Sequence, residues 1–205
     1  MKVIVDNGIK SVKEIIPLLN GFEAIELIFL NSSDFNNSNI KDADALLIRS
    51  TVQINEALLV DTNVHFIGSA TAGIDHMDTD YLNKKNIKWF YAAGCNGLSV
   101  SNYVMSSICF LMENNIFNSD NSVGIIGYGN VGKQLKKALD YFSIKNFVYD
   151  PFLHFDFLSN LELVKNCDLS SLHVPLTSKT EFPTNNMINK GFLEDIKGKS
   201  LINTS

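Results

Sequence analysis

The chain has 205 residues, of which 45% are hydrophobic and 19% are charged, and its net charge at neutral pH is −5. This composition fits a globular protein with one large domain or two small ones, and the acidic balance argues against nucleic acid as a partner. No apolar run is long enough to span a membrane, and the N-terminal apolar run is too short for a signal peptide, so we expect a cytoplasmic protein with no membrane partner.

The first half of the chain alternates short apolar runs with helical patterns, which predicts a parallel α/β architecture. The expected strands lie at residues 3–5, 25–30, 46–48, 64–67 and 87–90. The expected helices lie at residues 11–19, 55–59 and 80–86. Residues 31–39 are rich in Asn and Ser, and we expect them to form a loop.

A longer helix is predicted over residues 99–115, because apolar side chains recur there at helical spacing. The polar residues 118–122 end this pattern, and a second series of strands and helices then begins. Strands are expected at residues 123–126, 147–149, 169–172 and 201–203. The sequence therefore predicts two α/β lobes, each built on a doubly wound parallel sheet.

The second series opens on the segment VGIIGYGNVG, in which a strand runs into Gly127, Gly129 and Gly132 and then into a helix. In a dinucleotide-binding turn, the first glycine permits the tight turn, the second lets a pyrophosphate approach the backbone, and the third lets the helix pack closely. The helix N-terminus favours the phosphate charge. Asp150 ends the next apolar run, where it would bind a ribose diol and repel a 2′-phosphate, which favours NAD over NADP. The competing interpretation is a structural strand–helix turn that binds no ligand.

Segments along the whole chain resemble the D-isomer-specific 2-hydroxyacid dehydrogenases. They are KVIVDNG, DADALLIRSTVQINEALL, FIGSATAGIDHMD, AAGCNGLSVSNYV, VGIIGYGNVGKQL, YDP, LHVPLT and LINTS. SATAGIDHMD and GCN are typical of a branch with a phosphorylated substrate, whereas the glycine motif and HVPLT are shared by the wider family. The resemblance implies a flavodoxin-like substrate lobe at residues 1–98, without its C-terminal return segment, and an incomplete Rossmann NAD lobe at residues 99–205.

The resemblance also implies roles for single residues. Ser50 and Thr71 occupy the positions that contact the phosphorylated substrate, and their hydroxyls suit a phosphate dianion. Asn130 and Val131 would offer backbone contacts to the pyrophosphate, and Val174 would line the adenine–ribose side of the cofactor site. The implied activity is the NAD-dependent oxidation of a small phosphorylated 2-hydroxy acid.

The family's catalytic Arg, Glu and His would follow the LINTS segment, so we expect no catalytic residue in this chain and no turnover by the chain alone. The full-length family member is expected to be a homodimer. Two alternatives stay open. The chain could be a non-catalytic NAD-binding module, or it could belong to a dehydrogenase of a different D-2-hydroxy acid.

Other candidate groups are interpreted as structural. The four histidines have no carboxylate partner fixed by spacing; they are His65, His76, His154 and His173. No metal site is expected, because the sequence has no paired Cys or His motif. The three scattered cysteines suit a reducing compartment; they are Cys95, Cys109 and Cys167. Arg49 could hold substrate charge or form a salt bridge at a strand end.

Overall fold

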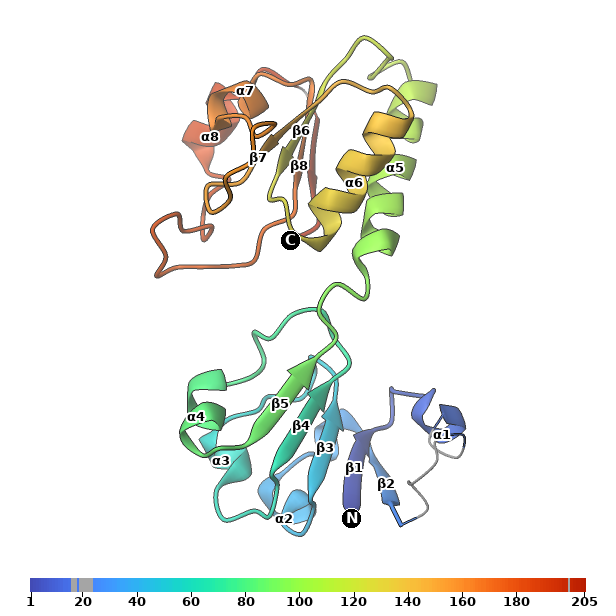
Figure 1. Ribbon diagram of the computed structural model, residues 1–205, viewed down its shortest axis with the longest axis vertical. Coiled ribbons are helices and arrows are strands. Elements are labelled where there is room, and N and C mark those ends of the chain that lie inside the picture. Colours follow the sequence, from blue (N-terminus) through green and yellow to red (C-terminus); the bar gives the residue numbers. More distant parts are fainter. Residues whose placement is uncertain (16–17, 19–23, 199) are drawn as a thin grey trace. The chain divides into compact units, whose positions relative to one another are not determined.

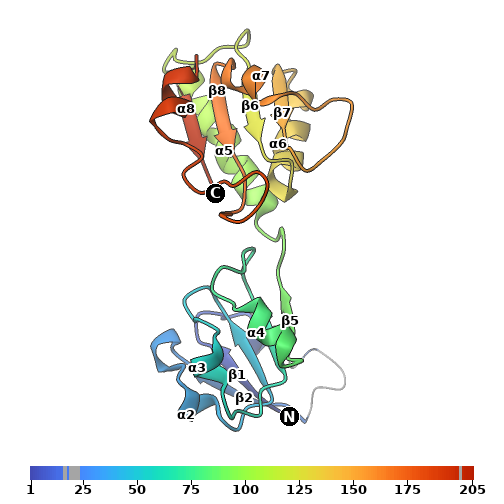
Figure 2. The same cartoon turned by 90° about the vertical axis from the view of Figure 1, so that its left-hand side faces the viewer.

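Two parallel β-sheets form the framework of the chain, one in each of two compact units, Met1–Cys95 and Asn96–Ser205 (Figures 1 and 2). The computed structural model describes residues 1–15, 18, 24–198 and 200–205. None of the described helices combines the length and the apolar character that crossing a membrane would require. The prediction of an α/β protein with two parallel sheets is confirmed.

The sheet of the first unit has five strands, all paired in parallel. They are β1 (Lys2–Asp6), β2 (Glu26–Leu30), β3 (Ala45–Ile48), β4 (Phe66–Ser69) and β5 (Lys88–Tyr91). Their order is β2-β1-β3-β4-β5, which is the flavodoxin-like order. All five strands were expected from the sequence, although β4 begins two residues later than predicted.

The helices of the first unit are short, with three to six residues each. They are α1 (Val12–Ile15), η2 (Ser32–Asp34), α2 (Asn37–Ile40), α3 (Glu56–Leu59) and α4 (Thr79–Lys84). The helix predicted at residues 11–19 is present at α1, and its residues 16, 17 and 19 lie outside the described part of the chain. The loop predicted at residues 31–39 was wrong, because η2 and the start of α2 lie there. The Asn36 side chain caps α2 by accepting the N–H of Asn39 at 3.0 Å.

Both faces of the first sheet are covered, as expected for a doubly wound fold. On one face, Ile4, Leu46 and Ile67 are fully buried among residues of α2, α3 and α4. On the other face, Val3 and Val5 pack beside α1. The side chains of β1 alternate between the two faces and are buried on both, since this strand lies between β2 and β3.

The sheet of the second unit has four described strands in the order β7-β6-β8-β9. They are β6 (Val123–Ile126), β7 (Asn146–Tyr149), β8 (Leu169–Leu172) and β9 (Ser200–Asn203), and all were expected from the sequence. Beyond β7, Val148 forms an isolated parallel bridge with Leu158, on the side opposite β6. This bridge occupies the position of the third strand of a Rossmann sheet, so the strand order is the one expected for a dinucleotide-binding half.

The helices of the second unit cover both faces of its sheet (Figure 1). They are α5 (Gly97–Glu113), α6 (Asn130–Tyr141), α7 (Leu161–Lys165) and α8 (Lys190–Asp195). Val104 and Ile108 of α5 pack with Leu135 and Leu139 of α6 in one core cluster. The first turn of α5 lies against α6, since a Cβ on Gly97 would be 3.3 Å from the Asn130 carbonyl oxygen. The sequence predicted α5 and α6 but not α7 and α8.

Candidate functional site

Each glycine of the turn after β6 has the backbone conformation or the surroundings expected for its place in a dinucleotide-binding turn. Gly127 has a φ of +97°, a conformation that disfavours side chains, and its N–H donates to the Tyr149 carbonyl oxygen at 2.8 Å. A Cβ on Gly127 would also overlap the backbone of His173. A Cβ on Gly132 would overlap the Gly127 carbonyl oxygen, so the start of α6 packs directly on the turn. These two positions require glycine for the fold itself.

Gly129 differs from the other two glycines, because the fold leaves open space beside it. A Cβ built on Gly129 would meet no atom within 4 Å. Gly129 is the N-cap of α6, and no side chain caps this helix. The first N–H groups of a helix have no intrahelical partner, so those of Asn130 and Val131 remain available to an anion beside Gly129. The open space and the unused donors fit a phosphate group.

Asp150 follows β7 and connects that strand to the glycine turn. One carboxylate oxygen accepts the N–H of Tyr128 at 2.9 Å, and the other accepts the N–H of Phe152 at 3.1 Å. These bonds orient the carboxylate at the carboxyl-terminal end of β7. An acidic group in this position is the one that a Rossmann fold uses to hold a ribose diol.

A pocket of about 390 Å³ brings four of the predicted cofactor residues together, namely Gly127, Gly129, Asp150 and Val174. This volume lies within the range of small-molecule sites. Asn130, Val131 and Gly132 do not line the pocket but form the adjoining helix start. The other lining residues were not predicted from the sequence; they include Tyr149, Phe152, Leu161, Phe182, Pro183 and Met187. The rings of Phe152 and Phe182 meet edge to face, with centroids 5.5 Å apart.

His173 also borders this pocket, and its environment agrees with a structural role. Its two ring nitrogens lie 3.0 Å from the Ser171 hydroxyl and 2.7 Å from the Thr204 hydroxyl. Burial lowers the pKa of His173 to about 4, so the imidazole is neutral near pH 7. A similar effect acts on His76, because burial lowers its pKa and its Nε2 lies 2.9 Å from the Ser69 hydroxyl.

The predicted substrate residues follow two neighbouring strands of the first sheet. Ser50 lies two residues after the end of β3 and is exposed. Thr71 lies two residues after the end of β4, and its hydroxyl is 2.7 Å from the Ser69 hydroxyl and donates to the Gly73 carbonyl oxygen at 3.1 Å. The two hydroxyls share the carboxyl-terminal edge of the sheet, but no hydrogen bond joins them. Their predicted contact with substrate stays a prediction.

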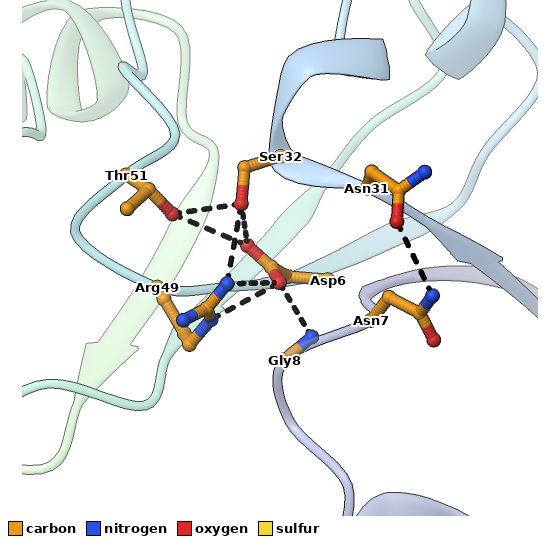
Figure 3. Close-up of polar contacts among 7 residues, drawn as sticks. All are labelled: Asp6, Asn7, Gly8, Asn31, Ser32, Arg49 and Thr51. Atoms are coloured by element: carbon orange, nitrogen blue, oxygen red, sulfur yellow. Dashed lines mark hydrogen bonds and ion pairs between the residues drawn. The ribbon is translucent and has the colours of Figure 1, made fainter.

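A polar cluster that the sequence analysis did not predict as a whole lies at the same edge (Figure 3). Its centre is Asp6, the last residue of β1, which is fully buried. Arg49 forms an ion pair with this carboxylate at 2.9 Å, so the salt bridge considered for Arg49 is present. Burial by itself would raise the pKa of Asp6, but hydrogen bonds from Gly8, Ser32 and Arg49, with the arginine charge, outweigh it and lower the pKa. Asp6 and Ser32 could have been found from the sequence, because each follows a predicted strand.

No group of three or more His, Cys, Asp or Glu side chains is placed to hold a metal ion within the described ranges of the chain. Near the predicted site residues, the groups that could bind a ligand are hydroxyls, backbone N–H groups, the ion pair of Asp6 with Arg49, and the carboxylate of Asp150.

Comparison with known proteins identifies the family. Residues 3–198 match the family model described as the D-isomer specific 2-hydroxyacid dehydrogenase catalytic domain. Erythronate-4-phosphate dehydrogenase of Wigglesworthia glossinidia brevipalpis is 41% identical over 212 residues, which cover 100% of this chain and 54% of the relative. The corresponding protein of Hahella chejuensis is 37% identical over 211 residues, with the same coverage of 100% and 54%.

A solved structure supports the same assignment. The NAD⁺-bound 3-phosphoglycerate dehydrogenase of Entamoeba histolytica is 28% identical, has a TM-score of 0.73, and is matched over 88% of this chain and 64% of that chain. The chain spans about half the length of the curated relatives that it matches, at 54% for both. Since the family model covers nearly all of its residues, the chain belongs to the D-isomer-specific 2-hydroxyacid dehydrogenase family.

Proposed function

We propose that the protein is an NAD-dependent dehydrogenase that oxidises 4-phospho-D-erythronate to 3-hydroxy-2-oxo-4-phosphobutanoate, a step toward pyridoxal phosphate (vitamin B6). The substrate is suggested by the erythronate-4-phosphate dehydrogenases that are 41% and 37% identical over the whole chain. The observation that carries the cofactor is the open space at Gly129, which lies at a helix start in a pocket that Asp150 also lines.

In this proposal, each part of the pocket binds one part of NAD. The backbone at residues 129–131 holds the pyrophosphate, Asp150 holds the adenine ribose, and Val174 lines the adenine–ribose side. Bound NAD supplies the hydride-accepting nicotinamide, while the protein supplies position and charge. The carboxylate of Asp150 would repel the 2′-phosphate of NADP, which supports a preference for NAD.

In the first unit, Ser50 and Thr71 are proposed to contact the substrate phosphate. Both side chains are hydroxyl donors, and both follow the carboxyl ends of neighbouring strands, where ligands bind in open α/β sheets. A cytoplasmic location and a homodimer are proposed for the whole protein. The location is supported by three cysteines that form no disulfide. Light scattering on the purified whole protein tests the dimer.

Gly129→Val tests the cofactor pocket. The fold leaves room for a side chain at this position, but a valine side chain would occupy the space proposed for the pyrophosphate. We expect the variant to fold, and to bind NADH at least about tenfold more weakly in titration calorimetry, the factor that loss of one charge-assisted hydrogen bond would give. Asp150→Ser should weaken NADH binding and narrow the preference for NADH over NADPH. If the wild-type chain bound no NADH at millimolar concentration, the dehydrogenase proposal would be wrong.

The substrate requires a separate assay on the whole protein. We expect NADH production with 4-phospho-D-erythronate and none with D-lactate or D-glycerate. Activity on the unphosphorylated acids alone would assign the protein to a different branch of the family. Binding of NADH without turnover of any of these acids by the whole protein would favour a non-catalytic NAD-binding module.

A further inference from the structure

We propose that Asp6 is a positioning residue that fixes the Arg49 guanidinium so that its Nη1 group is presented to an anionic group of the substrate beside Ser50. The inference rests on the proposed function, because it assigns the orienting machinery of the substrate site in the first unit. It concerns Asp6, Gly8 and Ser32, whose side chains or backbone hold the arginine rather than touch the ligand.

The carboxylate of Asp6 is the fixed point of the cluster (Figure 3). One of its oxygens accepts the Gly8 N–H at 2.8 Å, and the other accepts the Ser32 hydroxyl at 2.7 Å. Thr51 adds a longer contact of 3.4 Å from its hydroxyl. The side chain is 0% exposed, so these partners, which come from three different strand ends, leave the carboxylate a single orientation.

The guanidinium of Arg49 uses only part of its hydrogen-bonding capacity on this carboxylate. Nε donates to Asp6 Oδ1 at 3.0 Å, and Nη2 donates to the same oxygen at 2.9 Å and to the Ser32 hydroxyl at 3.3 Å. A guanidinium carries five N–H donors, so the two on Nη1 have no partner among the residues that the structure describes. The Arg49 side chain is 40% exposed, and Ser50, the next residue along the chain, is exposed at the same edge of the sheet.

The backbone of Gly8 also limits where the Arg49 guanidinium can lie. The guanidinium lies directly on the Gly8 backbone, because a Cβ built there would overlap its central carbon and two of its nitrogens. A larger residue at position 8 would push the guanidinium away from Asp6 without changing any charge. The glycine and the buried carboxylate therefore hold the same group from two directions.

Removing the charge of Asp6 has two opposite effects on anion binding, one through the orientation of Arg49 and one through electrostatic repulsion. A carboxylate beside an anion-binding site repels the anion, so its charge alone would weaken binding. If Asp6 acts by holding Arg49, its removal weakens anion binding in spite of the lost repulsion. The sign of the change in affinity therefore separates orientation from electrostatics.

The test measures binding of 4-phospho-D-erythronate and, separately, of NADH to the chain and to Asp6→Asn. We expect the phosphorylated acid to bind about tenfold more weakly to the variant, as for the loss of one charge-assisted hydrogen bond, while NADH binding is unchanged. Asp42→Asn is the matched control, since it removes the same charge from an exposed residue at the amino-terminal edge of the same sheet. Its affinity for the acid should equal that of the wild type or exceed it slightly.

Gly8→Ala keeps every charge and provides a second variant in case Asp6→Asn does not fold. We expect it to weaken binding of the acid, and to shift the Arg49 Nε–H resonance in ¹⁵N NMR spectra, which reports the displaced guanidinium. Unchanged or tighter binding of the acid by both folded variants would overturn the proposal. If the wild-type chain failed to bind NADH, this result would count against the proposed function instead, so the two failures can be distinguished.

Discussion

His173 has a fixed tautomer because hydroxyl groups flank both of its ring nitrogens. The Thr204 hydroxyl donates its only proton to the Leu172 carbonyl oxygen at 3.1 Å, so it must accept from His173 Nδ1 at 2.7 Å. Nε2 then has no proton and accepts from the Ser171 hydroxyl at 3.0 Å. A second proton would therefore go to Nε2, and burial disfavours the charged ring, which lowers the pKa of His173 to about 4.

This histidine makes stability depend on pH in a defined range. In the unfolded chain the imidazole takes up a proton below its ordinary pKa of 6.5, whereas in the folded chain it does so only near 4. The unfolded state therefore binds more protons between these values, so the free energy of unfolding falls as the pH decreases through this range. Between about pH 7 and pH 5 we expect His173 to account for a decrease of about 2 kcal/mol.

Urea denaturation at the two pH values measures this decrease, and His173→Asn should show a smaller one. The lowered pKa of His76 contributes in the same direction and remains in the variant. The carboxylates with lowered pKa, Asp6 and Asp140, lose their contribution only below the ordinary aspartate pKa of 3.8, outside this range. An equal decrease in wild type and variant would mean that the imidazole is not held neutral.

At the scale of elements, the sequence predicted the strands, the two long helices and three short helices, α1, α3 and α4, but it did not predict α2, α7 and α8. The strands are runs of branched and aromatic residues, and α5 and α6 are long enough to show helical spacing. By contrast, α2, α7 and α8 have four to six residues, too few for a periodic pattern. Each begins at an asparagine whose side chain accepts an N–H three residues later; these caps are Asn36, Asn160 and Asn189. The usable signal was the capping residue rather than the apolar pattern.

The same distinction explains how much of the candidate site was predictable. The glycine turn and Asp150 are local features, since spacing along one strand–helix–strand unit fixes them. Phe152 and Phe182 reach the same pocket from segments that are distant along the chain, and the cluster around Asp6 joins the ends of three strands. Such contacts depend on tertiary packing, which the sequence pattern does not specify.

The packing of α7 on β6 leads to a prediction for Gly124. A Cβ there would be 2.6 Å from Val164 Cγ1 and 2.8 Å from the Val164 carbonyl oxygen, so the helix backbone would have to move. We expect Gly124→Ala to lower the free energy of unfolding by about 1–3 kcal/mol, although alanine is normally the better residue within a strand. Chemical denaturation measures the change.

Gly68→Ala is the control, because it makes the same replacement within a strand of the other sheet. Its new Cβ would be 2.8 Å from the end of the Leu47 side chain, which can rotate, so the cost should stay below about 1 kcal/mol. If the two variants lost equal stability, the close approach of the α7 backbone would not be the cause.

At the scale of the whole molecule, the pocket proposed for NAD lies within one unit. All lining residues in the described part of the chain lie between Ile126 and Met187, inside Asn96–Ser205. This unit also has its own core around Val104, Ile125 and Leu139. A polypeptide of residues 96–205 should therefore bind NADH within about threefold of the affinity of the 205-residue chain, as expected for a domain with its own core.

Calorimetry on the two polypeptides, after circular dichroism has verified that the shorter one is folded, checks this expectation. A folded fragment that had lost NADH affinity would mean that residues before position 96 contribute to the pocket.

The division also bears on how proteins of this family diversify. Mutations that reshape the ends of the first sheet, around Ser50 and Thr71, leave the glycine turn and Asp150 unchanged in sequence, because these residues belong to the other compact unit. In the proposed assignment, substitutions at the edge of the first sheet would change which acid is bound, while the second unit would keep its NAD site. A chimera that joins the first unit of another family member to residues 96–205 would combine a different acid site with the same NAD site.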